Sequence, residues 1–194
     1  MRLSAFVPEP ALSTILGRQH QEIDDALKAA GVAYTILRPT FFMQNILGAA
    51  QTIAADGVMY LPFGNGRAGI IDVRDIVDVA IEVLLSTDGH EGRTYTLTGP
   101  ASISMHHVAS ALTRALGREV KYVDVPVQAG IDSLIAMGMP KFMAETYGEL
   151  FVNFARGGGD RATDDVERVT GHAARSIDDF AGDFASAFLA ATAA

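Results

Sequence analysis

The sequence contains no cysteine among its 194 residues. Without a thiol the chain can form no disulfide bond, no thiolate nucleophile and no cysteine-ligated zinc site. Proteins of the reducing cytoplasm do not depend on disulfides. We therefore expect a cytoplasmic protein.

Long apolar runs are also missing. No stretch reaches the ~18 consecutive apolar residues that a membrane-spanning helix needs. The first ten residues, MRLSAFVPEP, lack the sustained apolar core of a signal peptide. We expect a soluble protein without a membrane partner.

Basic residues are outnumbered by acidic ones. The chain has 15 Lys and Arg against 23 Asp and Glu, which gives a formal net charge of -8 and a pI near 5.0. Nucleic-acid-binding proteins usually gather Lys and Arg on one face, and no such cluster stands out here. We expect no direct contact with nucleic acid.

The segment GNGRAG, Gly64 to Gly69, matches the dinucleotide-binding pattern G-x-G-x-x-G letter for letter. In a working motif a strand precedes the glycines and a helix begins within them, so that backbone N–H groups and the helix dipole meet the pyrophosphate. Here IIDVRD follows, which predicts another strand, and the next helix begins only at Asp75. We interpret GNGRAG as a flexible loop between two strands that can still shape a substrate pocket.

The hydrophobic pattern predicts alternating strands and helices. Apolar, β-branched and aromatic runs predict strands over 2–7, 32–39, 57–63, 68–72, 93–99 and 119–126, the first of them ended by Pro8 and Pro10. Helical periodicity predicts helices over 16–30, 76–85, 106–117, 127–137, 141–154 and 177–191, with Asp75 and Ser104 as N-caps and Gly31 as a C-terminal cap. The strand, helix, strand order is typical of a parallel βαβ crossover.

Strands dominate the first two thirds of the chain and helices the last third. We predict a single α/β domain, 1–194. A parallel sheet occupies about 1–125, and a smaller, mainly helical substrate lobe occupies about 126–194. This lobe would supply one wall of a cleft.

Four runs carry a family resemblance. They are HQEIDDALKAAGVAYTILRPTFFMQN from His20 to Asn45, RAGIIDVRDIVDVAIEVL, GHEGRTYTLTGP and SALTRALGREVKYVDVP. With VERVTG near the end, the chain resembles the NmrA-like branch of the atypical short-chain dehydrogenases/reductases over nearly its whole length. The resemblance implies a partial Rossmann-like sheet. It also implies either an NAD(P)H-dependent reductase of quinones or enones, or a redox-sensing regulator that binds the dinucleotide without catalysis.

The resemblance also shows what is missing before Met1. Family members begin with a strand and a G-x-x-G-x-x-G turn, whereas this chain resembles their C-terminal two thirds. NADP(H) or NAD(H) is the cofactor of the complete family, and we expect weak or no binding by this chain alone.

Three explanations for this difference stay open. The gene is read from too late a start, since the family commonly has Val-Arg-Leu-Ser where this chain has Met-Arg-Leu-Ser. Alternatively, the chain is a natural remnant that pairs its exposed sheet edge with a second copy or another subunit. Finally, it is a cofactor-free enzyme whose pocket survives. The exposed edge predicts a homo-oligomer.

His20 is the candidate catalytic residue. It belongs to a helical stripe with Leu16, Ile23 and Leu27 that should face the sheet, where a lone histidine is more often a satisfied core residue than a catalyst. By resemblance, His20 and Asp24 are spaced like the Tyr and Lys of the Y-x-x-x-K pair in short-chain dehydrogenases, although both phenol and ammonium are absent. If His20 acts, it acts as a weak acid or base, or as a hydrogen-bond partner of a ring or carbonyl.

The resemblance also assigns candidates for contact with the nicotinamide. Pro39, Thr40, Phe41 and Phe42 follow a strand at the edge of the sheet where ligands bind in open parallel sheets. Ser4, near the end of the first strand, corresponds to a position beside the ribose and nicotinamide. The alternative is that at least one of the two phenylalanines belongs to the core.

Substrate-side candidates come from two segments. Asn45 ends the run FFMQN and either bridges two loops or contacts a ligand. In the helical lobe, Met137, Met139, Met143 and Tyr147 either line a cavity for a small hydrophobic or quinone-like molecule or pack in a core.

The remaining polar residues favour structural roles. Asp72 and Asp75 are interpreted as a strand-end residue and a helix cap, with Arg38 as a partner of one of them. The histidines show no ligand spacing, so we predict no metal site. Three functions remain under consideration: an oxidoreductase, a non-catalytic redox-sensing or protein-binding regulator, and a cofactor-independent isomerase or cyclase.

Overall fold

The structure is a computed structural model that describes residues 1–7, 14–86 and 89–189. Its strands are β1 (Arg2–Leu3), β2 (Thr35–Pro39), β3 (Val58–Leu61), β4 (Arg67–Ala68), β5 (Arg93–Leu97), β6 (Ile103–Ser104) and β7 (Lys121–Asp124). Its helices are α1 (Ile15–Ala29), the 3-10 helix η1 (Met43–Ala49), α2 (Ala50–Asp56), α3 (Val73–Leu85), α4 (Met105–Leu116), α5 (Val127–Ala136), α6 (Lys141–Ala155), α7 (Asp165–Thr170), α8 (Ile177–Asp183) and α9 (Ala185–Leu189).

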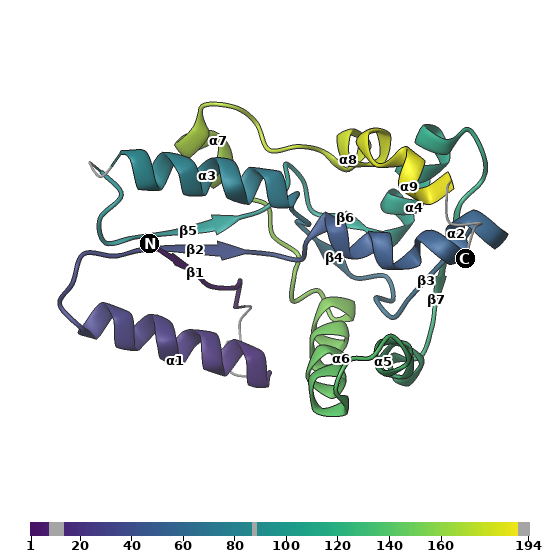
Figure 1. The fold of residues 1–194 in the computed structure, drawn as a ribbon, viewed down its shortest axis with the longest axis horizontal. Helices are drawn as coiled ribbons and strands as arrows, with labels where there is room; N and C mark the ends of the chain where they lie inside the picture. Colours follow the sequence, from purple (N-terminus) through teal and green to yellow (C-terminus); the bar gives the residue numbers. More distant parts are fainter. Residues whose placement is uncertain (8–13, 87–88, 190–194) are drawn as a thin grey trace.

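A parallel sheet with the order β1, β2, β5 forms one end of the molecule. Its register runs from Thr35 opposite Arg93 to Pro39 opposite Leu97, and Leu3 pairs with Leu37. Figure 1 shows α1 on one face of this sheet and α3 with α7 on the other. The predicted α/β architecture with parallel strands is therefore confirmed. Within the described residues β1 has no second neighbour, and its Leu3 is 52% exposed.

The other predicted strands do not join this sheet. β3 pairs in parallel with β7, and β4 pairs in antiparallel with β6. In place of the strand predicted over 68–72, the structure has the two-residue strand β4 and an isolated bridge between Ile71 and Phe42. The strand predicted over 2–7 continues past β1 only through hydrogen bonds from the Ser4 and Phe6 N–H groups to β2. Pro8, Pro10 and residues 190–191 lie outside the described residues.

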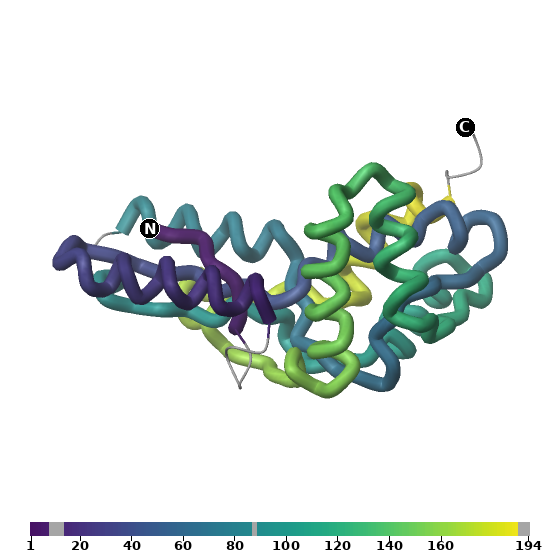
Figure 2. Tube along the Cα trace, turned by 90° about the horizontal axis from the view of Figure 1, so that it is seen from below, coloured from purple at the N-terminus to yellow at the C-terminus, as the bar shows by residue number. Residues whose placement is uncertain are grey.

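A second group of elements lies beyond the carboxyl ends of the parallel strands. It surrounds a large hydrophobic core that includes Ile46, Ile53, Phe63, Leu112 and Phe180. Figure 2 shows α5 and α6 side by side in this region, and α6 is the helix nearer to α1. Segments from the middle of the chain, such as α2 and α4, also build this core, whereas α7 packs against α3 and β5. The predicted helical lobe of 126–194 thus provides α5 and α6 next to the sheet edge.

The helix α3 begins earlier than predicted. Its N-cap is Asp72, whose carboxylate accepts a hydrogen bond from the Arg74 N–H at 2.9 Å. Asp75, the predicted cap, lies inside the first turn and is fully buried. The β-branched Val73 belongs to the helix although its neighbours Ile70 and Ile71 favour extended structure.

Two of the three glycines of GNGRAG, Gly66 and Gly69, are packed against backbone rather than open to a ligand. An added Cβ at Gly66 would lie 2.0 Å from the Phe154 carbonyl oxygen, and one at Gly69 would lie 2.0 Å from that of Arg161. A short strand, β4, occupies the end of the motif and no helix begins there. The segment is a structural junction between the sheet region and the end of α6.

We expect Gly69→Ala to lower the free energy of unfolding by about 2–4 kcal/mol, because the new methyl group overlaps backbone that cannot rotate away. Gly48→Ala is the matched control, since no atom lies within 4 Å of its added Cβ. Urea unfolding followed by circular dichroism measures both. A Gly69→Ala variant as stable as the control would contradict the packing described.

Candidate functional site

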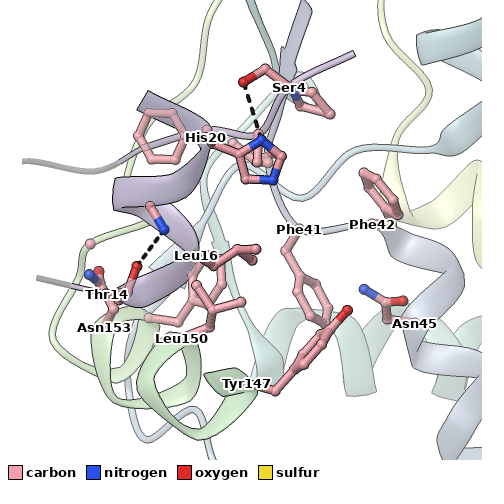
Figure 3. A pocket seen from close by; sticks show the side chains of 17 residues that line it. Ser4, Thr14, Leu16, His20, Phe41, Phe42, Asn45, Tyr147, Leu150 and Asn153 are labelled. Atoms are coloured by element: carbon pink, nitrogen blue, oxygen red, sulfur yellow. Dashed lines mark hydrogen bonds between the residues drawn. The ribbon is translucent and has the colours of Figure 1, made fainter. Parts of the chain in front are cut away.

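An apolar cavity of about 160 Å³ lies at the carboxyl ends of β1 and β2. Segments that follow these two strands form one side, α1 forms the second and α6 the third, as Figure 3 shows. This is the edge at which open parallel sheets usually bind ligands. The apolar part of the lining consists mainly of Phe6, Leu16, Phe41, Phe42, Leu150 and Phe154.

Eight residues singled out by sequence line this one cavity. They are Ser4, His20, Pro39, Thr40, Phe41, Phe42, Asn45 and Tyr147. Met137 and Met139 are not among the lining residues, and Met137 is 64% exposed. Met143 lines a neighbouring surface groove between α1 and α6 together with Tyr147. The structure thus brings the two predicted groups together but leaves out the methionines.

The two aromatic rings that follow β2, Phe41 and Phe42, form an aromatic wall of the cavity and pack against hydrophobic cores on their other side. The Phe41 ring packs edge-on against Phe63 and Phe154, with centroid distances of 5.1 and 5.6 Å. Phe42 packs against a second hydrophobic core, which lies between the sheet and α3. Each ring therefore lines the cavity and also contacts a core, and their contact with a nicotinamide stays a prediction.

Thr40 is buried and its hydroxyl is already occupied. The Oγ1 donates to the Gly69 carbonyl oxygen, and it also lies 3.3 Å from the Leu97 carbonyl oxygen. The backbone N–H of Thr40 donates to the same Leu97 oxygen at 3.1 Å. Thr40 consequently fixes the path of the chain from β2 into the cavity wall.

A buried carboxylate, Asp24, organises the polar side of the cavity. It accepts hydrogen bonds from Arg2 Nε at 2.7 Å, Arg38 Nη2 at 2.8 Å and Ser4 Oγ at 3.0 Å. Burial alone would raise the pKa of Asp24, but the hydrogen bonds from Arg2, Arg38 and Ser4 outweigh it and lower the pKa. Asp24 is therefore ionised and joins α1 to β1 and β2.

His20 lies one turn before Asp24 and lines the cavity. The predicted buried stripe of α1 is only partly present: Ile23 is 50% exposed, whereas Gly17 and Asp24 are buried. Helix α1 packs on the sheet through its ion pairs rather than through an apolar stripe. His20 is thus half-buried beside the charged cluster instead of within a core.

The contacts of His20 determine its protonation. Burial lowers the pKa of His20, the charge of Arg2 lowers it further, and Asp24 opposes the shift. The ring is therefore neutral at pH 7. Its Nδ1 lies 3.3 Å from Arg2 Nη2 and 3.4 Å from Ser4 Oγ.

Arginine can only donate hydrogen bonds, and the Ser4 hydroxyl donates to Asp24. The Nδ1 atom thus accepts from Arg2, which places the proton of the neutral ring on Nε2. In Figure 3 this second ring nitrogen points into the cavity, toward Phe41. His20 can therefore donate a hydrogen bond to a ligand.

Two further polar groups stand across the cavity from His20. Figure 3 shows the Tyr147 hydroxyl, from α6, directed toward Phe41 and Asn45. Asn45 is exposed at the rim, and its backbone N–H donates to the Phe42 carbonyl oxygen at 3.1 Å. Both side chains are positioned to meet polar atoms of a bound molecule.

Arg38 pairs with Asp24 and not, as predicted, with Asp72 or Asp75. Residues alternate between the two faces of β2. Leu37 faces α3 and its core, so Arg38 faces α1. The aspartates at the start of α3 therefore lie on the opposite side of the sheet.

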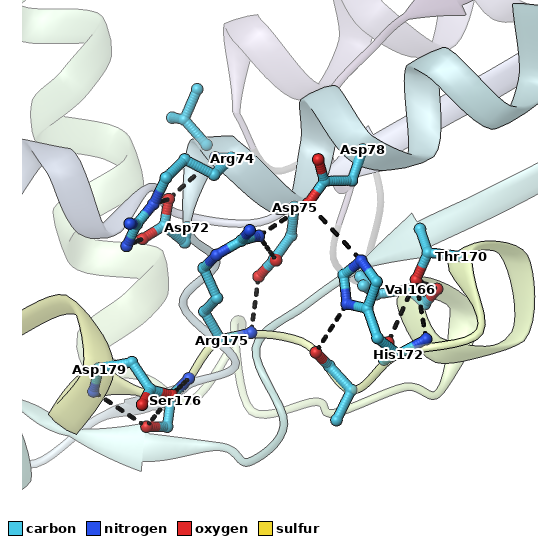
Figure 4. A network of polar contacts seen from close by, with 12 residues as sticks. Asp72, Arg74, Asp75, Asp78, Val166, Thr170, His172, Arg175, Ser176 and Asp179 are labelled. Atoms are coloured by element: carbon cyan, nitrogen blue, oxygen red, sulfur yellow. Dashed lines mark hydrogen bonds and ion pairs between the residues drawn. The ribbon is translucent and has the colours of Figure 1, made fainter.

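Asp72 and Asp75 belong to a separate polar network, shown in Figure 4. Asp75 accepts hydrogen bonds from the Arg175 backbone N–H at 2.8 Å and from its guanidinium. Burial raises the pKa of Asp75 despite this partner. The pKa of Asp72 is lowered because hydrogen bonds from Arg74 and Gln44 outweigh its burial. The network fastens α3 to the segment before α8 and does not reach the cavity.

Sequence reasoning missed several residues of the site. Leu150 and Phe154 lie one and two turns beyond Tyr147 on α6, so helical spacing could have identified them. No local sequence pattern indicates the role of Arg2, because its partner Asp24 lies 22 residues away. Among the described residues, no group of three His, Asp or Glu side chains could hold a metal ion. No helix in the described ranges is long and apolar enough to cross a membrane.

The NmrA-like family profile matches residues 15–181. The chain belongs to the NmrA-like family. It is 39% identical over 176 residues to an NAD(P)H azoreductase from Xenophilus azovorans, which covers 91% of this chain and 61% of the relative. It is 32% identical to (4-alkanoyl-5-oxo-2,5-dihydrofuran-3-yl)methyl phosphate reductase from Streptomyces griseus, with coverages of 94% and 64%.

Solved structures of NmrA-like proteins share the fold. The NADPH-dependent quinone oxidoreductase QOR2 from Escherichia coli aligns with a TM-score of 0.83 at 23% identity, over 94% of this chain and 66% of that protein. NmrA, a negative transcriptional regulator solved in complex with NAD, aligns with a TM-score of 0.70 at 18% identity, over 93% and 62% of the two chains. The predicted Rossmann-like fold is confirmed, and the chain spans less than two thirds of the length of these relatives.

The residues of this NmrA-like chain fit one half of a dinucleotide better than the other. The cavity offers an apolar, aromatic-lined space with a few polar atoms, which suits a flat nicotinamide ring. A pyrophosphate needs glycine-rich backbone N–H groups at the first turn of a helix that follows a strand. Within the described ranges no such turn is present, and α3 begins with two buried aspartates instead.

We expect Asp24→Asn to lower the free energy of unfolding by about 3–5 kcal/mol, because it leaves Arg2 and Arg38 without their buried counter-charge. The pKa of Asp24 is lower in the folded chain, so its contribution is complete above pH ~4 and is lost as the pH falls through the folded value. The variant should lack this acid-dependent loss. Asp25→Asn, at an exposed neighbouring position, is the control. Thermal unfolding across acidic pH would refute the assignment if the two variants behaved alike.

We also expect the His20 ring to titrate below pH 6.5 in NMR spectra. Arg2→Gln should move this midpoint upward, because the nearby positive charge that disfavours protonation is removed. Arg93→Gln removes a charge of the same sign from β5, which β2 separates from β1, and should leave the midpoint unchanged. A midpoint that does not respond to Arg2 would show that the two side chains are not neighbours.

Proposed function

We propose that this chain forms the substrate-binding and nicotinamide-side part of an NAD(P)H-dependent oxidoreductase that reduces quinone-like or enone-like acceptors. The observation that supports this most strongly is the convergence of eight sequence-predicted residues on one aromatic-lined cavity at the carboxyl ends of β1 and β2. Flat apolar acceptors suit such a wall, because aromatic rings pack against each other with favourable geometry.

The names of the relatives support the same acceptor class. One is an azoreductase, and another, 27% identical, is Quinone oxidoreductase 2 of Escherichia coli. The Streptomyces relative is named for a 5-oxo-2,5-dihydrofuran, a ring in which a carbon–carbon double bond is conjugated with a carbonyl. Azo, quinone and enone groups all accept a hydride into a flat conjugated system.

The residues of this chain then have separable roles. Ser4, Pro39, Thr40, Phe41 and Phe42 would hold the nicotinamide, which supplies the hydride when bound. The aromatic wall excludes water from the reacting groups.

His20 would donate its Nε2–H to the acceptor's carbonyl oxygen or azo nitrogen. It thereby stabilises the negative charge that develops there as the hydride arrives. Asn45 and Tyr147 would fix the other end of the acceptor.

Binding of the whole dinucleotide by this chain alone should be weak. The contacts available to it lie around the nicotinamide, whereas much of a dinucleotide's affinity comes from the pyrophosphate and adenosine. Added NAD(P)H would therefore saturate the chain only at high concentration.

A non-catalytic, redox-sensing regulator is the second candidate. One observation favours it, and it concerns Asp24, which stands where short-chain dehydrogenases have the Lys of their Y-x-x-x-K pair. Asp24 is fully committed to Arg2, Arg38 and Ser4, so it cannot lower the pKa of a proton donor as an ammonium would. Such a protein would bind the nicotinamide without turning over an acceptor.

Kinetics with NADPH and naphthoquinone test the proposal. We expect His20→Gln to lower kcat/KM about ten- to a hundredfold, because the hydrogen bond to the acceptor is made mainly in the transition state. Tyr147→Phe should mainly raise KM.

His106→Gln is the control, since this ring packs edge-on against Tyr122 and does not line the cavity. Full activity of His20→Gln would exclude the role given to the ring. NADPH binding without any quinone turnover would favour the regulator.

A further inference from the structure

A second, polar pocket of about 350 Å³ adjoins the apolar cavity. The two share Phe6 and Gly158 as lining residues. The polar pocket is built by Arg38 and Thr96, neighbours on β2 and β5, and by the glycine-rich loop RGGGDR, Arg156 to Arg161. Neither the proposed hydride transfer nor the packing of the core accounts for this combination of residues.

Arg161 brings a positive charge to the boundary between the two pockets. Its guanidinium lies over the Phe6 ring, 5.9 Å from the centroid, within the range of a cation–π contact. Among the described residues no carboxylate lies within ion-pair distance of it. The guanidinium therefore has hydrogen-bond donors available to a ligand.

The surrounding charges also favour an anion. Two guanidinium groups line the pocket, those of Arg38 and Arg161, and Arg38 is paired with Asp24. Asp160 also lines the pocket, but its carboxylate accepts from Ser102 Oγ at 2.6 Å and lies 3.8 Å from Arg67 Nε. A locally positive pocket on a chain with a net charge of -8 is a specific feature rather than a reflection of composition.

The backbone around Arg161 is fixed by contacts to β4 and its following loop. The Gly159 carbonyl oxygen accepts from the Gly69 N–H at 3.2 Å and from the Arg161 N–H at 2.8 Å. An added Cβ at Gly159 would lie 2.5 Å from the Phe154 ring and 2.9 Å from Ala68 Cβ. Gly159 is packed tightly against Phe154 and Ala68, so the attachment point of Arg161 beside the cavity is preorganised.

We propose that the polar pocket binds an anionic group, a carboxylate, sulfonate or phosphate, carried by the flat apolar molecule that occupies the cavity. The ring of the molecule would lie against Phe41 and Phe6, and its acidic substituent would reach Arg161 and Arg38. Guanidinium groups match the geometry of such oxyanions through paired N–H donors. This inference rests on the proposed function for the cavity and restricts its substrates to acidic aromatic or enone compounds.

Calorimetric titration of the purified chain tests the proposal without requiring turnover. The probes are naphthalene sulfonate, the neutral naphthol, and methanesulfonate as a free anion. We expect the sulfonated ring to bind at least fivefold more tightly than naphthol, and its affinity to fall as salt is added. Methanesulfonate alone should bind much more weakly, because it lacks the part that fills the cavity.

Variants assign the preference to the pocket. Arg161→Gln should weaken the binding of naphthalene sulfonate about fivefold and change the affinity for naphthol less than twofold. Arg161→Lys should retain part of the preference for the sulfonate over naphthol. Arg93→Gln, with the same loss of charge at the far end of β5, should have no effect. Thermal unfolding of each variant checks that it is folded.

Each other outcome overturns the proposal in a distinguishable way. Equal binding of naphthol and the sulfonate would remove the anion subsite but leave the oxidoreductase proposal intact. Equal binding of methanesulfonate would show a free-anion site unconnected with the cavity. An Arg161→Gln variant that loses both aromatic probes equally would show that Arg161 only supports the wall. Binding of neither aromatic probe would reject the cavity as the site, and the proposed function with it.

Discussion

The carboxylate of Asp24 is the constraint on which the cavity depends. It is fully buried, and it holds two guanidinium groups and a hydroxyl that come from β1 and β2. Because Asp24 belongs to α1, these contacts set the position of the helix on the sheet and hence that of His20. An apolar helix face could slide along the sheet, whereas this set of hydrogen bonds permits one arrangement. The polar side of the cavity is therefore a consequence of how α1 is attached.

The same cluster explains why this site differs from a short-chain dehydrogenase site with Tyr and Lys. An ammonium at position 24 would promote ionisation of a neighbouring donor, whereas Asp24 is neutralised by arginines and Arg2 instead occupies His20 Nδ1. The ring is left with one donor, directed into the cavity. Catalysis in this arrangement would rely on polarisation of the acceptor and on the cofactor, with little proton transfer by the protein.

The sequence predicted the parts of the site that have local signals. The strand that ends at Pro39, the aromatic pair after it, the family resemblance and the methionine-containing helical segment singled out the eight residues that line the cavity. The predicted pairing of Arg38 is wrong because Arg38 lies on the face of β2 opposite to α3. The predicted cap at Asp75 is wrong because the β-branched Val73 belongs to the helix. The distribution of strands among three sheets could not be foreseen, since pairing between distant short strands leaves no periodic trace.

The glycine contacts of the loop after β3 also decide how a molecule can reach the cavity. Gly66 and Gly69 lie directly against backbone at and beyond the end of α6, so this end of the helix acts as a fixed pivot. Nearer its middle, α6 meets α1 through a surface hydrogen bond, from the Ile15 N–H to Glu149. The groove beside that contact shares Leu16 and Tyr147 with the cavity. The α1 side is thus one where the cavity continues toward the surface, between α1 and the middle of α6.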